Sequence, residues 1–163
     1  MKLLTGALVA MLGGMAARDA QPEPVFPLQG TWTLIAADKI LPDGKRARDY
    51  GESPKGRLIV DAKGRYSLQI FNSERPLFVS DNKPDASVDE LKSAVMGSST
   101  HYGTMAIDER AAVLVFSIEG SSFPNWEGTT QRRQYTLEGA ELQYQVPARA
   151  DGSIPVSVWR RLD

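Results

Sequence analysis

Along most of the chain, apolar and polar residues alternate in short runs that end at glycine or aspartate turns. The clearest run covers residues 141–146, where Leu142, Tyr144 and Val146 alternate with polar neighbours. A strict two-residue period places one side of a strand in a core and the other side in water. Closely spaced runs of this kind, rich in β-branched and aromatic residues, are typical of an antiparallel sandwich or barrel. The chain is therefore predicted to be all-β.

Nine segments fit the strand pattern. They are residues 30–37, 57–61, 65–71, 77–80, 99–107, 112–119, 129–137, 141–147 and 154–162. Turn sequences separate several of them, such as Asp-Ala-Lys-Gly at 61–64 and Ala-Asp-Gly at 150–152. Aspartate favours the start of a turn and glycine adopts the positive φ that many turns require. Consecutive strands are thus expected to pair as antiparallel hairpins.

One segment has a helical pattern instead. Ser87 and Glu90 have the spacing of a capping box, Val88, Leu91 and Val95 share a helical face, and Gly97 can end the helix. The pattern predicts one short helix between two strands. Two interpretations stay open: a plug or lid that closes one end of a barrel, and a surface helix with no gating role.

The N-terminus is predicted to lie outside the fold. Lys2 precedes an apolar stretch over residues 3–15, and the small residues Ala16 and Ala17 follow before a proline-rich linker. This order is typical of a secretory signal peptide, which we assign to residues 1–20, with the domain itself over residues 28–163. The protein is expected to be exported, to the periplasm or outside the cell. The stretch is too short to predict a membrane span; the alternative is an amphipathic or frayed N-terminal segment.

Composition removes most familiar chemistries. The chain has 163 residues and 42% hydrophobic content, which suits one globular domain. Its 19 basic and 20 acidic residues give a formal net charge of -1, so a nucleic-acid partner is not expected. With no cysteine and one histidine, thiol nucleophiles, disulfides, thiolate metal sites and paired imidazoles are excluded. We predict neither a metal nor a cofactor.

Catalytic motifs are weak as well. A Ser-His-Asp triad would have to use His101, and the Gly-x-Ser-x-Gly sequence of α/β-hydrolases is missing from the chain. Nucleotide-binding glycine motifs and a His-Glu-x-x-His helix are missing too. No catalytic residue is assigned. A pair of carboxylates from distant strands stays open as a possibility.

A family resemblance covers residues 28–163. It is carried by Gly30-Thr31-Trp32 on the first strand and Trp159-Arg160-Arg161 on the last, and by internal motifs at residues 50–58, 64–67, 75–78, 102–104 and 123–129. In this order the motifs resemble the bacterial and fungal lipocalin-like domain family. The resemblance implies a single antiparallel up-and-down lipocalin-like (calycin) β-barrel with one short helix and a central apolar cavity. It also implies that Trp32 packs against an arginine that closes the barrel; we assign Trp32 and Arg161 to stability.

Arg133 is the most informative polar residue. It shares a strand face with Tyr135 and Leu137, which are expected to point inward, so its guanidinium is expected inside the barrel. Burying an unpaired charge costs several kcal/mol, roughly. Arg133 therefore needs a carboxylate, backbone carbonyls or the anionic group of a ligand. A structural ion pair, a position at the barrel end in contact with water, and a ligand contact all stay open.

Further aromatic and polar residues are candidates for the same pocket, although each could equally be ordinary core. The predicted ligand-binding residues are Arg133, Tyr135, Arg75, Phe78, His101, Tyr102, Phe116, Trp126 and Tyr144. Together they offer apolar rings with a few groups that can orient a ligand.

Three functions are compatible with this pattern. The favoured one is an exported carrier or sensor that binds a small hydrophobic or amphipathic molecule in the barrel cavity. The alternative is an isomerase or cyclase, in which Arg133, Tyr135 or His101 polarises a carbonyl or moves a proton. The third is a structural or envelope domain whose interior is filled by side chains. Nothing in the sequence pattern indicates an oligomeric state.

Overall fold

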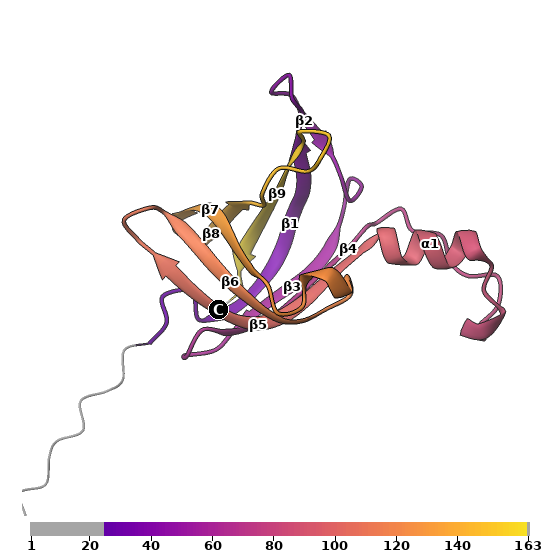
Figure 1. Ribbon diagram of the computed structural model, residues 1–163, viewed down its shortest axis with the longest axis horizontal. Coiled ribbons are helices and arrows are strands. Elements are labelled where there is room, and N and C mark those ends of the chain that lie inside the picture. The colour runs from indigo at the N-terminus through magenta and orange to yellow at the C-terminus, as the bar shows by residue number, and fades with distance from the viewer. Residues whose placement is uncertain (1–24, 163) are drawn as a thin grey trace, which may run out of the picture.

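A computed structural model describes residues 25–162 and shows an antiparallel sheet that closes on itself (Figure 1). The elements are β1 (Gly30–Ile40), β2 (Arg46–Arg48), β3 (Lys55–Val60), β4 (Arg65–Phe71), η1 (Lys83–Asp85), α1 (Val88–Met96), β5 (Ser98–Asp108), β6 (Val113–Ser121), η2 (Pro124–Trp126), β7 (Thr130–Glu138), β8 (Glu141–Gln145) and β9 (Ile154–Arg161). Eight strands, β1 and β3 to β9, pair with their neighbours in chain order, and β9 pairs back with β1. The short β2 pairs in antiparallel orientation with the last residues of β1. The predicted all-β, up-and-down barrel is confirmed.

Alternation along the strands builds the core. On β4 the inward residues Tyr66, Leu68 and Ile70 are buried, and on β8 Leu142 and Tyr144 are buried between exposed or half-buried polar neighbours. The two-residue period therefore assigns each strand one apolar face, and closing the sheet turns that face inward.

The Trp32 and Arg161 pair closes one end of the barrel. Trp32 on β1 is fully buried, and its indole Nε1 donates a hydrogen bond to Leu28 O at 3.1 Å. The guanidinium carbon of Arg161 lies 4.3 Å from the Trp32 ring centroid, and its nitrogens donate to the carbonyls of Gln29 and Pro27. The predicted stacking of Trp32 on an arginine is thus confirmed.

Some predicted strand features are wrong. Residues 77–80 form no strand, because this apolar run belongs to a connection that leaves the sheet, where Leu77 and Val79 are 93% and 98% exposed. Strand β2 was not predicted, since its Arg-Ala-Arg sequence is short and polar. Leu137, expected to point into the core, is 40% exposed near the β7–β8 turn.

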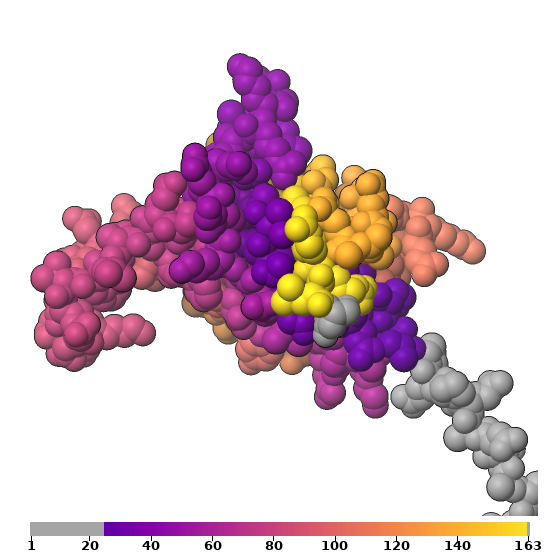
Figure 2. Space-filling view, turned by 180° about the vertical axis from the view of Figure 1, so that it is seen from behind, coloured from indigo at the N-terminus to yellow at the C-terminus, as the bar shows by residue number. Residues whose placement is uncertain are grey.

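The predicted helix is α1, and its capping box is confirmed. The hydroxyl of Ser87 accepts from Glu90 N, the Glu90 carboxylate accepts from Ser87 N, and Gly97 ends the helix. We call residues 75–97, which contain α1, the arm. The arm projects away from the barrel (Figures 1 and 2). The plug or lid interpretation therefore does not describe this structure.

The predicted signal peptide lies outside the described residues. Within residues 25–162, no helix is both long and apolar enough to cross a membrane.

Candidate functional site

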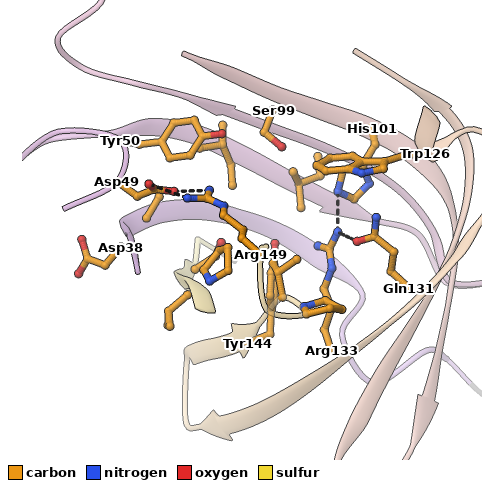
Figure 3. A pocket seen from close by; sticks show the side chains of 18 residues that line it. Asp38, Asp49, Tyr50, Ser99, His101, Trp126, Gln131, Arg133, Tyr144 and Arg149 are labelled. Carbon is orange, nitrogen blue, oxygen red and sulfur yellow. Dashed lines mark hydrogen bonds and ion pairs between the residues drawn. The ribbon is translucent and has the colours of Figure 1, made fainter. Parts of the chain in front are cut away.

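A cavity of about 390 Å³ lies in the barrel (Figure 3). On β1 it is lined by Ala37 and Asp38, several residues beyond Trp32. Its walls come from β1, β4, β5, β7, β8 and β9, and from η2 and the loops that follow β2 and β8. Part of the cavity lining is apolar, with Leu68, Ile70, Val146 and Val156 among the lining residues. The barrel interior is therefore not filled by its own side chains, as a purely structural domain would require.

Arg133 lies in the wall of this cavity. The alternation of β7 turns it inward, where it is 3% exposed, while its neighbour Arg132 points outward to an ion pair with Asp108 at 3.0 Å. The Arg133 guanidinium carbon lies 4.1 Å from the Phe116 ring centroid and 5.1 Å from that of Tyr144. Two aromatic faces thus support the buried cation.

The hydrogen bonds of Arg133 go to neutral groups. Its Nη2 lies 2.9 Å from Gln131 Oε1 and 3.1 Å from His101 Nε2. No carboxylate of residues 25–162 forms an ion pair with Arg133. Burial lowers the pKa of Arg133 from its ordinary value, yet an arginine side chain stays protonated in proteins. The cavity wall therefore carries a positive charge that no nearby acid neutralises.

His101 is held as the neutral imidazole. Because the guanidinium can only donate, Nε2 accepts from Arg133, and Nδ1 carries the proton that it donates to Tyr66 Oη at 2.8 Å. Burial, and the charge of Arg133 beside it, lower the pKa of His101 to about 3. Burial likewise raises the pKa of Tyr66. Tyr66, His101 and Arg133 are thus linked by two hydrogen bonds, and Arg133 carries the only charge among them.

Three buried polar atoms form no hydrogen bond of good geometry within the described part of the chain: Arg133 Nε, Tyr144 Oη and Trp159 Nε1. Tyr144 lies under the guanidinium and stacks on Trp159, with ring centroids 6.4 Å apart. Buried polar groups are normally paired, so such a cluster in a native protein needs an explanation. Tyr144 links the other two, because burial raises the pKa of its hydroxyl while the neighbouring Arg133 and Trp159 side chains lower it.

The acidic residues at the cavity mouth are already paired. Asp49 accepts a bidentate contact from Arg149, at 3.0 and 2.6 Å, and lies 3.5 Å from Lys39 Nζ. Asp38 binds Arg46 and Arg48 on β2, at 2.7 and 3.1 Å. The mouth carboxylates therefore do not compensate the charge of Arg133.

The structure brings several predicted site residues together. Arg133, His101, Trp126 and Tyr144 line the cavity. Phe116 lies against the guanidinium, and Tyr135 is half-buried opposite Tyr144 on the neighbouring strand.

Three other predicted site residues lie elsewhere. Tyr102 is 54% exposed on the outer face of β5, packed across the backbone of Gly120. Phe78 is half-buried in the arm. Arg75 lies at the arm's base, where it donates to Asn72 O and Ser98 Oγ.

Sequence reasoning missed other lining residues. Gln131 could have been found, because it lies two positions before Arg133 on the same strand face. No local sequence pattern connects Asp49 with Arg149, because they lie in loops that are 100 residues apart. Among residues 25–162, His, Asp and Glu side chains do not gather in groups of three or more, as a metal site would need.

Comparison with known families identifies the fold. A family model described as "Lipocalin-like domain" matches residues 29–162. The chain belongs to the lipocalin-like domain family. The searches of curated proteins and of solved structures give no match. For this lipocalin-like domain, the family supports a ligand-binding barrel but names no ligand, so the chemistry of the cavity must indicate it.

Proposed function

We propose that the protein binds a small hydrophobic or amphipathic molecule in the barrel cavity, with an acidic head group on Arg133. The observation that carries this proposal is the buried guanidinium in the cavity wall, which bonds a neutral imidazole and an amide, packs on aromatic rings, and forms no ion pair with a carboxylate of residues 25–162. A buried charge without a counter-ion lowers the stability of the fold, and an anion bound to the guanidinium would offset this desolvation cost.

The cavity suits this class of ligand. Its volume of about 390 Å³ lies within the range of small-molecule sites, and its lining combines the Arg133 guanidinium with apolar side chains. A ligand with an acidic head and an apolar body would place the head on Arg133 and the body along Leu68, Ile70 and Val156. A charge-assisted contact with a carboxylate would fix this orientation.

Binding is favoured over the alternative of an isomerase or cyclase. Proton transfer would fall to His101, but a pKa of about 3 makes its imidazole a weak base near neutral pH. An isomerase or cyclase could still use Arg133 to polarise a substrate carbonyl, and the experiment below also tests this mechanism.

The test is to extract the natively purified protein with organic solvent and to identify what is released by mass spectrometry. A retained weak acid with an apolar body supports the carrier, and conversion of that molecule on incubation supports the enzyme. If nothing is released, and apolar carboxylic acids leave the melting temperature unchanged, the proposal fails.

We also propose that the protein is exported. The support is the N-terminal sequence pattern alone, with Lys2 before the apolar residues 3–15 and small residues after them. The intact mass of the protein recovered from the periplasm or medium tests this. Loss of the first 17 or 20 residues is expected, and an uncleaved chain retained in the cytoplasm would contradict it.

A further inference from the structure

The arm, residues 75–97, holds its shape with polar contacts and turns its apolar side chains to solvent. The Glu90 carboxylate accepts hydrogen bonds from Val79 N and Ser87 N, both at 2.7 Å, and so ties the loop to α1. The arm's exposed large apolar residues are Leu77, Val79, Val88, Leu91, Val95 and Met96. Leu77, Val79 and Val88 are at least 80% exposed. A concentrated apolar surface of this kind typically marks an interaction site.

A helix as short as α1 is marginal when it stands alone. It has nine residues, none of them buried, and its packing on the barrel is at β5. Most helical stability in proteins comes from packing an apolar face, and Val88, Leu91 and Val95 form such a face here. Within residues 25–162, nothing covers the apolar face of the arm.

Hydrogen bonds and packing hold the base of the arm. Asn72 N donates to Gly97 O at 2.8 Å, and Ser98 Oγ donates to Ala94 O at 2.7 Å. The side chain of Arg75 fills the space beside Gly97, where a Cβ would lie 2.5 Å from it, and donates to Ser98 Oγ at 3.0 Å. Because α1 passes directly into β5 at this packed junction, the arm extends outward (Figures 1 and 2). Its cover therefore has to be sought outside residues 25–162.

The charges on the arm indicate what that cover is. The arm holds four acids, Asp81, Asp85, Asp89 and Glu90, against two lysines and Arg75, whose guanidinium is bound at the arm's base. This balance opposes an anionic membrane surface. The same chain offers the complementary charge, because the exposed Arg46 and Arg48 of β2 share the single carboxylate of Asp38.

We propose that the arm is a dimerisation surface that packs on a second copy of this chain. Each apolar arm face is covered by the other copy, and the acidic residues of each arm face Arg46 and Arg48 of the other. Such a contact is reciprocal, as a twofold dimer requires. The proposal is independent of whether the cavity binds a ligand.

The test is the molar mass of the ligand-free protein in sedimentation or light scattering across a dilution series. We expect twice the chain mass at high concentration and dissociation on dilution. Leu91→Ser combined with Val95→Ser should raise the dimer dissociation constant by about tenfold or more, since central apolar contacts dominate interfaces. Added salt should also raise it, because the contact pairs charges across the interface.

Ile59→Ser is the matched control. Ile59 is an apolar residue on the barrel wall, 49% exposed and outside the arm, so its replacement should leave the mass unchanged. A wild-type protein that is monomeric at every concentration overturns the proposal, as does a Leu91→Ser/Val95→Ser variant that dimerises like the wild type. Co-sedimentation of a monomer with phosphatidylcholine and phosphatidylglycerol vesicles would assign the arm to a lipid surface instead, and would also overturn it.

Discussion

Arg133 donates through Nη2 to Nε2 of His101 at 3.1 Å, so the only histidine of the chain is held neutral by the cation that it orients. The contact joins β5 to β7 across the barrel interior. A neutral acceptor leaves the positive charge of Arg133 in place, which distinguishes this arrangement from a structural ion pair.

His101 should make the fold sensitive to acid. In the unfolded chain its pKa lies near the ordinary value of 6.5, and in the folded protein it is lowered to about 3. Between these values the unfolded state binds the extra proton, so the free energy of unfolding falls as the pH decreases, by at most about 1.4 kcal/mol per pH unit. This contribution is fully present above pH 6.5.

This pH dependence of the free energy of unfolding is measured by denaturant unfolding of the wild type and of His101→Gln at a series of pH values. Between pH 6.5 and 3, the free energy of unfolding of the glutamine variant should fall less steeply with decreasing pH than that of the wild type. Because the chain has one histidine, NMR of its imidazole nitrogens reports the same quantity directly. A midpoint near 6.5 in the folded protein would show that the imidazole is not held neutral.

Arg133 should destabilise the protein when the cavity is empty. Replacing it by methionine removes a buried charge and keeps a side chain that fills the space. We expect the free energy of unfolding of the ligand-free protein to rise by about 1 kcal/mol. Arg132→Met, on the outer face of the same strand, should leave it within about 0.5 kcal/mol. A clear loss of stability in Arg133→Met would instead assign the guanidinium to the fold.

Trp32 should be essential for the closed end of the barrel. It is fully buried, donates to Leu28 O and carries the Arg161 guanidinium on its ring. Trp32→Ala should lower the free energy of unfolding by about 3–5 kcal/mol, as large aromatic deletions in cores do. Trp126→Ala, at the half-buried rim of the cavity, serves as the control and should cost less. Equal melting temperatures for Trp32→Ala and the wild type would refute this role.

Alternation predicted much of the fold and part of the site. It placed Arg133 inside the barrel because the guanidinium shares a strand face with Tyr135. It could not assign both His101 and Tyr102 to the cavity, since neighbouring residues on a strand point to opposite faces. The structure turns His101 inward and Tyr102 outward.

Other features depend on contacts that a local pattern does not contain. The apolar residues Leu77 and Val79 look like a strand in the sequence, but they belong to the arm, where no described part of the chain covers them. The Asp49–Arg149 pair at the cavity mouth joins two loops that only barrel closure brings together. The capping box of α1, by contrast, is local and was predicted residue by residue.

The most direct test of the account compares an apolar acid with its ester. Calorimetric titration of decanoic acid and methyl decanoate into the wild type, Arg133→Leu and Arg132→Leu isolates the contact between a carboxylate and the buried guanidinium. Arg133→Leu should weaken binding of the acid by about tenfold or more and leave the ester unchanged, and Arg132→Leu should match the wild type for both. Equal losses for acid and ester in Arg133→Leu would contradict the assignment of Arg133 as the anchor of the ligand.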